Sequence, residues 1–257
     1  MRQEIPENHT RVMYDGLFAY FMELCTNPIY YDKLLFYGLV SEDSVKKARA
    51  IIKKPNATDG ELKINLFQVG YEVGGNLMNR YWRPKPQIMN AIENLQREEF
   101  DDSFVIGIQI RTFFINVTED MPKYFECALK IENDYYKECK LNKKPAKRVK
   151  WYLAVDFPSE INEFIKSQRY ANKIIHGIKV IPREIYHGIT EALWDVEMLS
   201  RCDQLICTGG STYGFLSAMK NRHFRFPYFI NGRLGMKECE IFTFAKPSTN
   251  ANHYETF

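Results

Sequence analysis

The sequence lacks the features that mark several classes of protein. It has no apolar run of about 18 residues, the length that a membrane-spanning helix needs, and its first ten residues, MRQEIPENHT, are polar. The chain as given therefore carries neither a predicted membrane span nor a predicted signal peptide. Its six cysteines show no Cys-x-x-Cys pairs of the kind that hold zinc, and no Asp-x-Asp motif, internal repeat or low-complexity segment is present.

A strong charge bias is also absent. The formal net charge is +3, because Lys and Arg are nearly balanced by Asp and Glu, and this does not indicate a nucleic-acid-binding protein. One basic run, Lys140 to Lys150, contains Pro145 and lies between two periodic segments. We interpret it as a solvated loop, with an anion-binding patch as the alternative. Hydrophobic residues at 45% and charged residues at 26% are typical of a soluble globular chain and exclude a disordered or fibrous one.

The pattern of predicted elements changes near residue 100. Residues 1–100 are predicted to be a partial, mostly helical region, and residues 101–257 a second domain in which strands and helices alternate. Because strands separated by single helices require right-handed crossovers, we expect an α/β fold with a Rossmann-like parallel sheet and helices on both faces. The predicted helices are 11–22, 42–53, 87–97, 121–140, 159–170, 190–202 and one that starts at Ser211; the predicted strands are 104–111, 149–156, 178–181, 204–207 and 227–230.

Ligands of open α/β sheets bind beyond the carboxyl ends of the strands, and this chain places polar residues there. The first strand ends in Arg111, and the fourth runs into the turn Gly209-Gly210-Ser211-Thr212 at the start of a helix. Backbone N–H groups of a helix amino terminus and the planar donors of arginine together favour a diphosphate. The alternatives are a plain turn capped by Ser211 or Thr212, and a surface ion pair for Arg111.

Two carboxylates are further candidates. Asp195 shares with Ala192 and Leu199 the stripe of its helix that should face the sheet. A buried carboxylate must accept hydrogen bonds or change its pKa, so Asp195 either braces a neighbouring backbone or accepts donors from a ligand such as a purine base. Asp156 follows the second strand; it is a candidate general base, or alternatively the cap of the next helix.

Three segments taken together resemble the donor-binding half of GDP-fucose fucosyltransferases. They are FVIGIQIR at 104–111, LAVDFPSE at 153–160 and WDVEMLSRCDQLICTGGSTYG at 194–214, within a resemblance that spans about residues 68–245. The GIQIR strand and the Ser-Thr-aromatic-Gly turn are most similar to plant-type, xyloglucan-like cell-wall fucosyltransferases, and the wider order is similar to α1,6-fucosyltransferases. Gln109 stands where the α1,6 enzymes carry a histidine, as in the plant type. Thr112 departs from the second arginine of the α1,6 motif, so the acceptor and linkage of that subfamily do not carry over.

The resemblance implies a GT-B-like donor domain that transfers L-fucose from GDP-fucose to a glycan hydroxyl, with inversion and without a metal or other cofactor. It implies that Arg111 contacts the diphosphate, that Asp195 hydrogen-bonds the guanine, and that Ser211 and Thr212 bind phosphate. With Arg111 and Asp156 as the catalytic candidates, the implied donor-binding set is Gln109, Arg111, Asp195, Gly209, Gly210, Ser211, Thr212 and Tyr213.

The same resemblance implies a place in the cell. GDP-fucose and a glycan acceptor are the expected partners, without nucleic acid, in the Golgi lumen, where glycoproteins or cell-wall glycans are built. Membrane attachment would then depend on a targeting segment outside this chain. Sequons at Asn8, Asn56 and Asn116 permit a secretory-pathway glycoprotein without establishing one.

Residues 1–100 are shorter than the acceptor-side region that such enzymes carry. Three explanations of this short region therefore stay open: a truncated fragment, a divergent short form, and an inactive relative. The alternative to an enzyme is a non-catalytic protein that binds a nucleotide sugar or a glycan. A further alternative is a glycosyltransferase of this fold that uses another nucleotide sugar.

Overall fold

The computed structural model describes residues 28–54, 59–112, 117–156, 161, 164–165, 170–177, 189–209, 211–221, 227–230 and 239–241. The chain divides into two compact units, Met1–Tyr81 and Trp82–Phe257. The sequence predicts a domain boundary between residues 100 and 101. The division at Tyr81 instead groups helix α5 (Pro86–Leu95) and the π-helical turn η2 (Gln96–Phe100) with the sheet.

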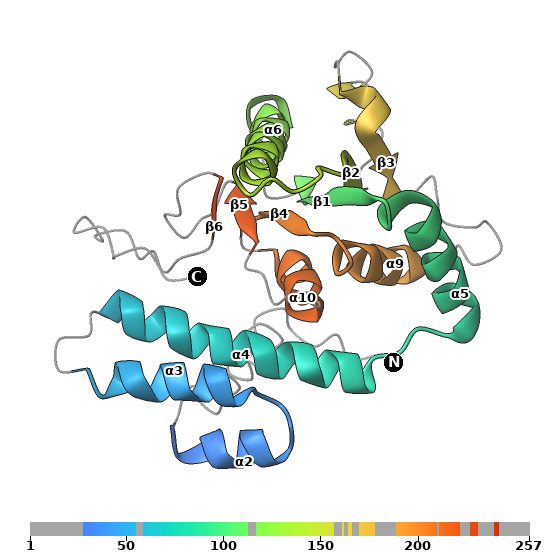
Figure 1. Ribbon diagram of the computed structural model, residues 1–257. Coiled ribbons are helices and arrows are strands. Elements are labelled where there is room, and N and C mark those ends of the chain that lie inside the picture. The colour runs from blue at the N-terminus through green and yellow to red at the C-terminus, as the bar shows by residue number, and fades with distance from the viewer. Residues whose placement is uncertain are drawn as a thin grey trace. The chain divides into compact units, whose positions relative to one another are not determined.

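The described secondary-structure elements of the first unit are all helices (Figure 1). Ser41 caps α3 by accepting a hydrogen bond from the Ser44 N–H, and the Glu72 carboxylate on α4 accepts one from the Ser41 N–H at 2.7 Å. The predicted helix 42–53 is confirmed, whereas 11–22 lies outside the described residues. The elements are η1 (Pro28–Tyr30), α2 (Tyr31–Phe36), α3 (Glu42–Ile52) and α4 (Asp59–Tyr81), and their shared core is Tyr31, Val40, Val45, Ala48, Val69 and Val73.

The second unit is built on one sheet with the strand order β3-β2-β1-β4-β5-β6. The first five strands are parallel, and β6 pairs antiparallel with β5. This confirms the predicted Rossmann-like sheet. The predicted strand 178–181 lies outside the described residues. The strands are β1 (Ser103–Ile110), β2 (Arg148–Val155), β3 (Ile174–His176), β4 (Gln204–Thr208), β5 (Tyr228–Ile230) and β6 (Glu240–Ile241).

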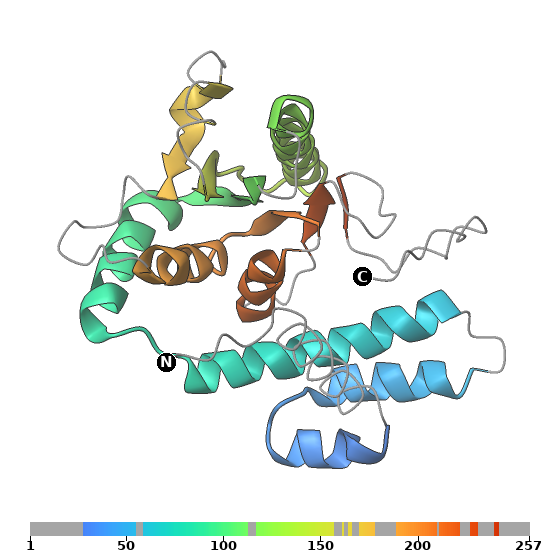
Figure 2. The same ribbon diagram turned by 180° about the vertical axis from the view of Figure 1, so that it is seen from behind.

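Helices cover both faces of this sheet, as Figures 1 and 2 show. Helix α6 (Val117–Leu141) packs on one face, where the β1 isoleucines meet its aromatic side chains. Helices α9 (Ile189–Leu199) and α10 (Thr212–Lys220) pack on the other face. Strand β1 is consequently apolar on both sides, as in other sheets that are covered twice. Among the described residues, none of the helices is both long and apolar enough to cross a membrane.

A close approach keeps α9 near the sheet. An added Cβ at Gly107 would lie 2.7 Å from Leu205 Cδ2 and 2.9 Å from Leu199 Cδ2, so this position of β1 has no room for a side chain. The predicted helices 121–140 and 190–202 correspond to α6 and α9. Of the predicted helix 159–170, only residues 161, 164, 165 and 170 are described; the first three are helical and residue 170 is a turn.

A buried ion cluster joins α9, α10 and η2. The Glu197 side chain, 1% exposed, pairs with Arg201 Nη1 at 2.8 Å and Lys220 Nζ at 3.1 Å. Arg201 Nε also donates to Gln96 Oε1 at 3.0 Å. Loss of Glu197 would leave two buried cations without their anion, so the cluster fixes the three elements against one another.

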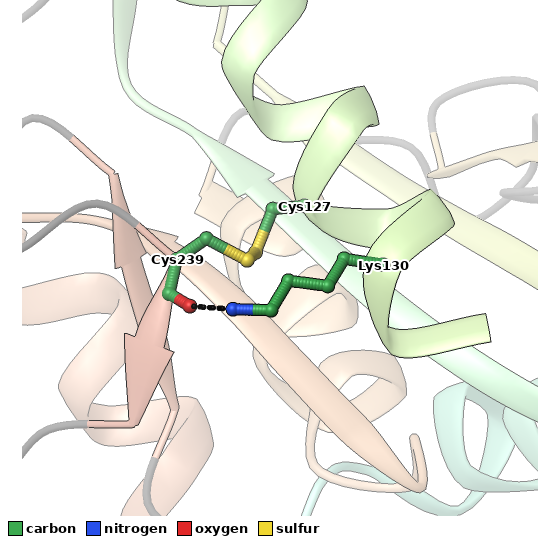
Figure 3. Close-up of a disulfide and its surroundings, with 3 residues drawn as sticks. All are labelled: Cys127, Lys130 and Cys239. Carbon is green, nitrogen blue, oxygen red and sulfur yellow. Dashed lines mark hydrogen bonds between the residues drawn. A yellow bond between two sulfur atoms is a disulfide. The ribbon is translucent and has the colours of Figure 1, made fainter. Parts of the chain in front are cut away.

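A disulfide clips the last strand to helix α6. Cys127 of α6 is bonded to Cys239, 112 residues further on and directly before β6 (Figure 3). Lys130 Nζ donates to the Cys239 carbonyl at 3.3 Å, and the Cys239 N–H donates to the Phe229 carbonyl at 3.0 Å. Among the other described cysteines, Cys139 is free and partly exposed.

Removal of this bridge should lower the stability of the sheet unit. We expect Cys127→Ser to reduce the free energy of unfolding by about 2 to 5 kcal/mol, because a loop of this length loses much entropy when closed. Urea unfolding under non-reducing conditions measures the change, with Cys139→Ser as the control that should match the wild type. Equal stability of Cys127→Ser and wild type would contradict a formed bridge.

Candidate functional site

A pocket of about 240 Å³ lies at the carboxyl ends of β1 and β2. It sits beside the point where the sheet is extended in opposite directions, through β2 on one side of β1 and β4 on the other, which is where open α/β sheets bind ligands. Its lining includes the predicted Gln109, Arg111, Asp156, Asp195 and Tyr213. The complete lining is Gln109, Ile110, Arg111, Ala154, Val155, Asp156, Glu191, Ala192, Asp195 and Tyr213.

The end of β1 is fixed by a buried hydroxyl network around Thr208. Thr208 Oγ1 accepts a hydrogen bond from the Arg111 N–H at 2.8 Å, lies 3.3 Å from the Gln109 carbonyl, and lies 2.7 Å from the Tyr124 hydroxyl. A hydroxyl donates one proton and accepts two hydrogen bonds, so Tyr124 is the donor to Thr208 if the Thr208 proton goes to Gln109. Burial raises the pKa of Tyr124, which keeps its phenol protonated for this role. The sequence alone gave no signal for Thr208 or Tyr124.

Gln109 is bound within the sheet. Its side-chain Oε1 accepts a hydrogen bond from the Thr208 N–H at 3.3 Å, and the residue is only 3% exposed. An added Cβ at Gly214 would lie 3.0 Å from the same oxygen, which shows how closely α10 approaches it. The side-chain oxygen of Gln109 therefore joins β1 to β4, although the residue also lines the pocket.

Arg111 and Asp156 face each other at the pocket mouth. Arg111 Nη1 lies 3.1 Å from Asp156 Oδ2, and the other oxygen, Oδ1, accepts hydrogen bonds from the N–H and the hydroxyl of Thr112, both at 2.9 Å. The Asp156 side chain is 15% exposed and that of Arg111 50% exposed. The ion pair foreseen as an alternative for Arg111 is thus present, and one nitrogen of its five-donor fork is engaged. Thr112, which stands in place of the second arginine of the α1,6 motif, orients Asp156 through these two hydrogen bonds.

Asp195 is a buried carboxylate with one strong partner. Its Oδ1 accepts a hydrogen bond from the Tyr152 hydroxyl at 2.6 Å, and no cation pairs with it among the described residues. Burial raises its pKa from 3.8 to about 7; the Tyr152 hydrogen bond opposes this rise, and the neighbouring Glu191 adds to it. Asp195 therefore binds a tyrosine side chain of β2 rather than the neighbouring backbone that the bracing alternative expected, and it also lines the pocket, as a ligand role requires.

Two backbone N–H groups of the glycine turn are engaged within the fold. The Gly209 N–H donates to the Ile230 carbonyl at 2.8 Å, and the Ser211 N–H to the Thr208 carbonyl at 3.1 Å. Ser211 is buried and holds the N-cap position of α10, but its side chain makes no capping hydrogen bond. Gly210 and the side chain of Thr212 lie outside the described residues. Within the described part of this segment, the N–H groups left for an anion are those of the first helical turn, from Thr212 onward.

Tyr213 of α10 lines the pocket next to α9. Its hydroxyl donates to the Ala192 carbonyl, which links α10 to α9. Burial raises the pKa of Tyr213, and the nearby Asp195 carboxylate adds to the rise. Among the described residues, no group of three or more His, Cys, Asp or Glu side chains is arranged to hold a metal ion.

The pocket has two chemically different walls. Helix α9 supplies the carboxylates of Glu191 and Asp195, whereas the end of β1 supplies the guanidinium of Arg111. A ligand that carries hydrogen-bond donors on one part and an anion on another would satisfy both walls. Such an arrangement suits a nucleotide better than a simple anion, which the two carboxylates would repel.

No protein-family model and no curated protein matches the sequence. Several solved structures match part of the fold. Fucosyltransferase NodZ from Bradyrhizobium is 21% identical, with 56% of this chain and 44% of that chain covered and a TM-score of 0.36. NodZ α1,6-fucosyltransferase soaked with GDP-fucose is 19% identical, with 64% and 48% covered and a TM-score of 0.35.

A mutant of Arabidopsis thaliana FUT1 in complex with GDP is 16% identical, with 66% of this chain and 39% of that chain covered and a TM-score of 0.40. This chain spans less than half the length of each of these proteins. All three of these structures are of fucosyltransferases.

Asp195 should make the protein less stable as the pH rises. Its pKa is about 7 in the folded state and 3.8 ordinarily, so the folded state holds the proton more tightly. The resulting stabilisation is complete below about pH 4 and is lost as the pH rises to 7, at a cost of up to about 4 kcal/mol. Asp195→Asn, which keeps an acceptor for Tyr152, should abolish this part of the pH dependence.

Urea unfolding at pH 5 and pH 8 tests this expectation, with Asp134→Asn on the exposed side of α6 as the control. The wild type should lose stability between the two pH values relative to Asp195→Asn. An identical pH dependence of the two proteins would show that Asp195 ionises normally in the fold.

Proposed function

We propose that this chain is the donor-binding part of a fucosyltransferase that transfers L-fucose from GDP-fucose to a glycan hydroxyl, with inversion and without a metal ion. The observation that carries the proposal is that Arg111 and Asp195, distant in sequence, line one pocket at the switch point of a parallel sheet. The three sequence segments that resemble GDP-fucose fucosyltransferases include both residues. That resemblance supports guanine as the base and fucose as the sugar of the donor.

Arg111 is proposed to bind the donor diphosphate. Its guanidinium is half exposed at the pocket, and the fork keeps donors beyond the one that faces Asp156. The first turn of α10 adds backbone N–H groups and the positive end of a helix dipole. Fixed positive charge of this kind can stabilise a leaving diphosphate in place of a divalent cation.

Asp195 is proposed to recognise the guanine. Guanine presents N1–H and a 2-amino group as adjacent donors, whereas adenine presents an unprotonated N1 and no 2-amino group. The buried carboxylate costs stability at neutral pH, as its raised pKa implies. Buried titratable groups in a cleft, with pKa values shifted by their surroundings, are typical of functional sites.

Asp156 is proposed to accept the proton of the acceptor hydroxyl. Thr112 holds its Oδ1, so Oδ2 is the oxygen that can take a proton. Arg111 faces that oxygen in the absence of a ligand, and a bound diphosphate would compete for the same guanidinium. Donor binding would in this way release the base at the moment when it is needed.

The compartment is proposed to be the Golgi lumen. The Cys127–Cys239 disulfide favours an oxidising environment, and the three sequons agree with one. Attachment to the membrane would then come from a segment outside this chain. The acceptor, whether on a glycoprotein or in a cell wall, stays open.

A second candidate is a non-catalytic protein that binds the nucleotide sugar. The contacts of Asp156 favour it, because both carboxylate oxygens face partners within the fold. Such a protein would bind GDP but would neither transfer fucose nor hydrolyse GDP-fucose. Incubation of the chain with GDP-fucose, with and without glycan acceptors, separates the two candidates by the release of GDP.

Arg111→Ala should weaken GDP binding by about 1.5 to 3 kcal/mol, the range for hydrogen bonds to charged groups. Arg111→Lys should recover only part of this loss, because an ammonium group cannot reproduce the planar fork. Titration calorimetry measures both, with Arg148→Ala at the exposed amino end of β2 as the control. Unchanged affinity in Arg111→Ala would remove the diphosphate role.

The wild type should prefer GDP to ADP by at least about tenfold, or 1.4 kcal/mol, if Asp195 reads the base. Asp195→Asn should shrink this preference, because a neutral amide accepts the hydrogen bonds of the base more weakly than a carboxylate does. Calorimetry with both nucleotides on folded protein provides the ratio. A ratio that is the same in Asp195→Asn and wild type would make Asp195 a structural brace only.

A further inference from the structure

Tyr152 lies behind the pocket rather than in it. It stands in the middle of β2, is fully buried, and is absent from the pocket lining. Its ring packs edge-on against Phe100 with 5.9 Å between ring centroids. Its hydroxyl reaches through to Asp195 Oδ1 at 2.6 Å and is the sole donor to that carboxylate among the described residues.

We propose that Tyr152 is a positioning residue that sets nucleobase selectivity through Asp195. The inference rests on the proposed function in one respect, namely that the ligand of Asp195 is a guanine nucleotide. The Tyr152 hydroxyl occupies Oδ1 and thereby fixes the plane of the carboxylate, since the two oxygens turn together. Oδ2 is then the oxygen that the site offers to a donor of the base.

Gly177, directly after β3, makes this contact possible. An added Cβ at this position would lie 2.5 Å from Asp195 Oδ1 and 2.7 Å from the Tyr152 hydroxyl. It would also lie 3.1 Å from the Leu153 carbonyl, so the backbone leaves no room for a shift. Oδ1 is therefore enclosed between Tyr152 and Gly177, and this directs the other oxygen to the open side.

The same hydrogen bond favours the charged form of Asp195. A donor to a carboxylate stabilises the anion, so the hydroxyl opposes the effect of burial. The other titratable groups around this carboxylate are Glu191, one turn earlier on α9, and Tyr213 of α10; Arg111 and Asp156 line the same pocket. None of these replaces a lost Tyr152 hydroxyl as a donor, because the Tyr213 hydroxyl is engaged with the Ala192 carbonyl.

Tyr152→Phe keeps the ring and removes only the hydroxyl. We expect GDP affinity at pH 7 to fall about three- to tenfold, the range for the loss of one hydrogen bond, and the preference for GDP over ADP to shrink. The pH at which GDP affinity is half lost should move upward, because Asp195 then takes its proton at higher pH. Calorimetry with GDP and ADP between pH 6 and pH 8.5 measures all three effects.

Two further variants show whether Tyr152 acts through Asp195. In the Asp195→Asn background, addition of Tyr152→Phe should change neither the GDP-to-ADP ratio nor the pH profile, because the titrating carboxylate is gone. Tyr135→Phe on α6 is the matched control, since its hydroxyl accepts from the Lys147 N–H at the surface. It should behave as the wild type does.

If Tyr152→Phe does not fold, 3-fluorotyrosine at position 152 provides the test in its place. Its hydroxyl is a stronger donor of nearly the same shape, so the pH midpoint of GDP binding should move downward. An unmoved midpoint and ratio in either protein, or an equal effect of Tyr152→Phe with and without Asp195, overturns the inference. If the wild type prefers GDP and Tyr152→Phe changes neither the ratio nor the pH midpoint, only this inference is refuted. If the wild type does not bind GDP, the proposed function is refuted as well.

Discussion

The parallel pairing of β1 on both of its edges is the constraint on which the rest of the structure depends. Because β2 and β4 both run parallel to β1, the carboxyl ends of the three strands meet at one edge of the sheet. The chain after β1 must leave through a helix on one face, and α9 and α10 cover the other. Arg111, Asp156 and the start of α10 are thereby placed around one pocket although long segments of chain separate them.

Of the charged groups in the pocket, Asp195 lowers the stability of the fold, whereas the pairing of Arg111 with Asp156 has little effect on it. Asp195 is buried and lacks a cation, so its charged form is unfavourable near neutral pH. The half-exposed Arg111 pairs with Asp156 in an ion pair that contributes at most about 1 kcal/mol. A nucleotide that donates to Asp195 and takes Arg111 would relieve the first cost and displace only a weak contact. The unliganded site is therefore better suited to binding than to stability.

The elements were predictable from the sequence where the apolar pattern was long. Strands β1 and β2 and helices α6 and α9 have such patterns, and Arg111 and Asp195 were identified because their charges interrupt them. The partners of these residues were not predictable, because Thr208, Tyr124 and Tyr152 reach the site only through strand register and helix packing. The two-residue strand β6 and the Cys127–Cys239 pairing carry no local signal at all. The hydrogen bond from the Gly209 N–H to a carbonyl of β5 was not predictable for the same reason.

The contacts of Asp156 impose an order on the proposed reaction. Thr112 holds Oδ1 through two hydrogen bonds that no ligand needs to break, whereas the contact of Oδ2 with Arg111 is the weak one. A bound diphosphate, which carries more charge than a carboxylate and matches the arginine fork, would take the guanidinium from Asp156. Asp156 would then keep its position and lose its neutralising partner. An acceptor hydroxyl would meet an effective base only after the donor is bound.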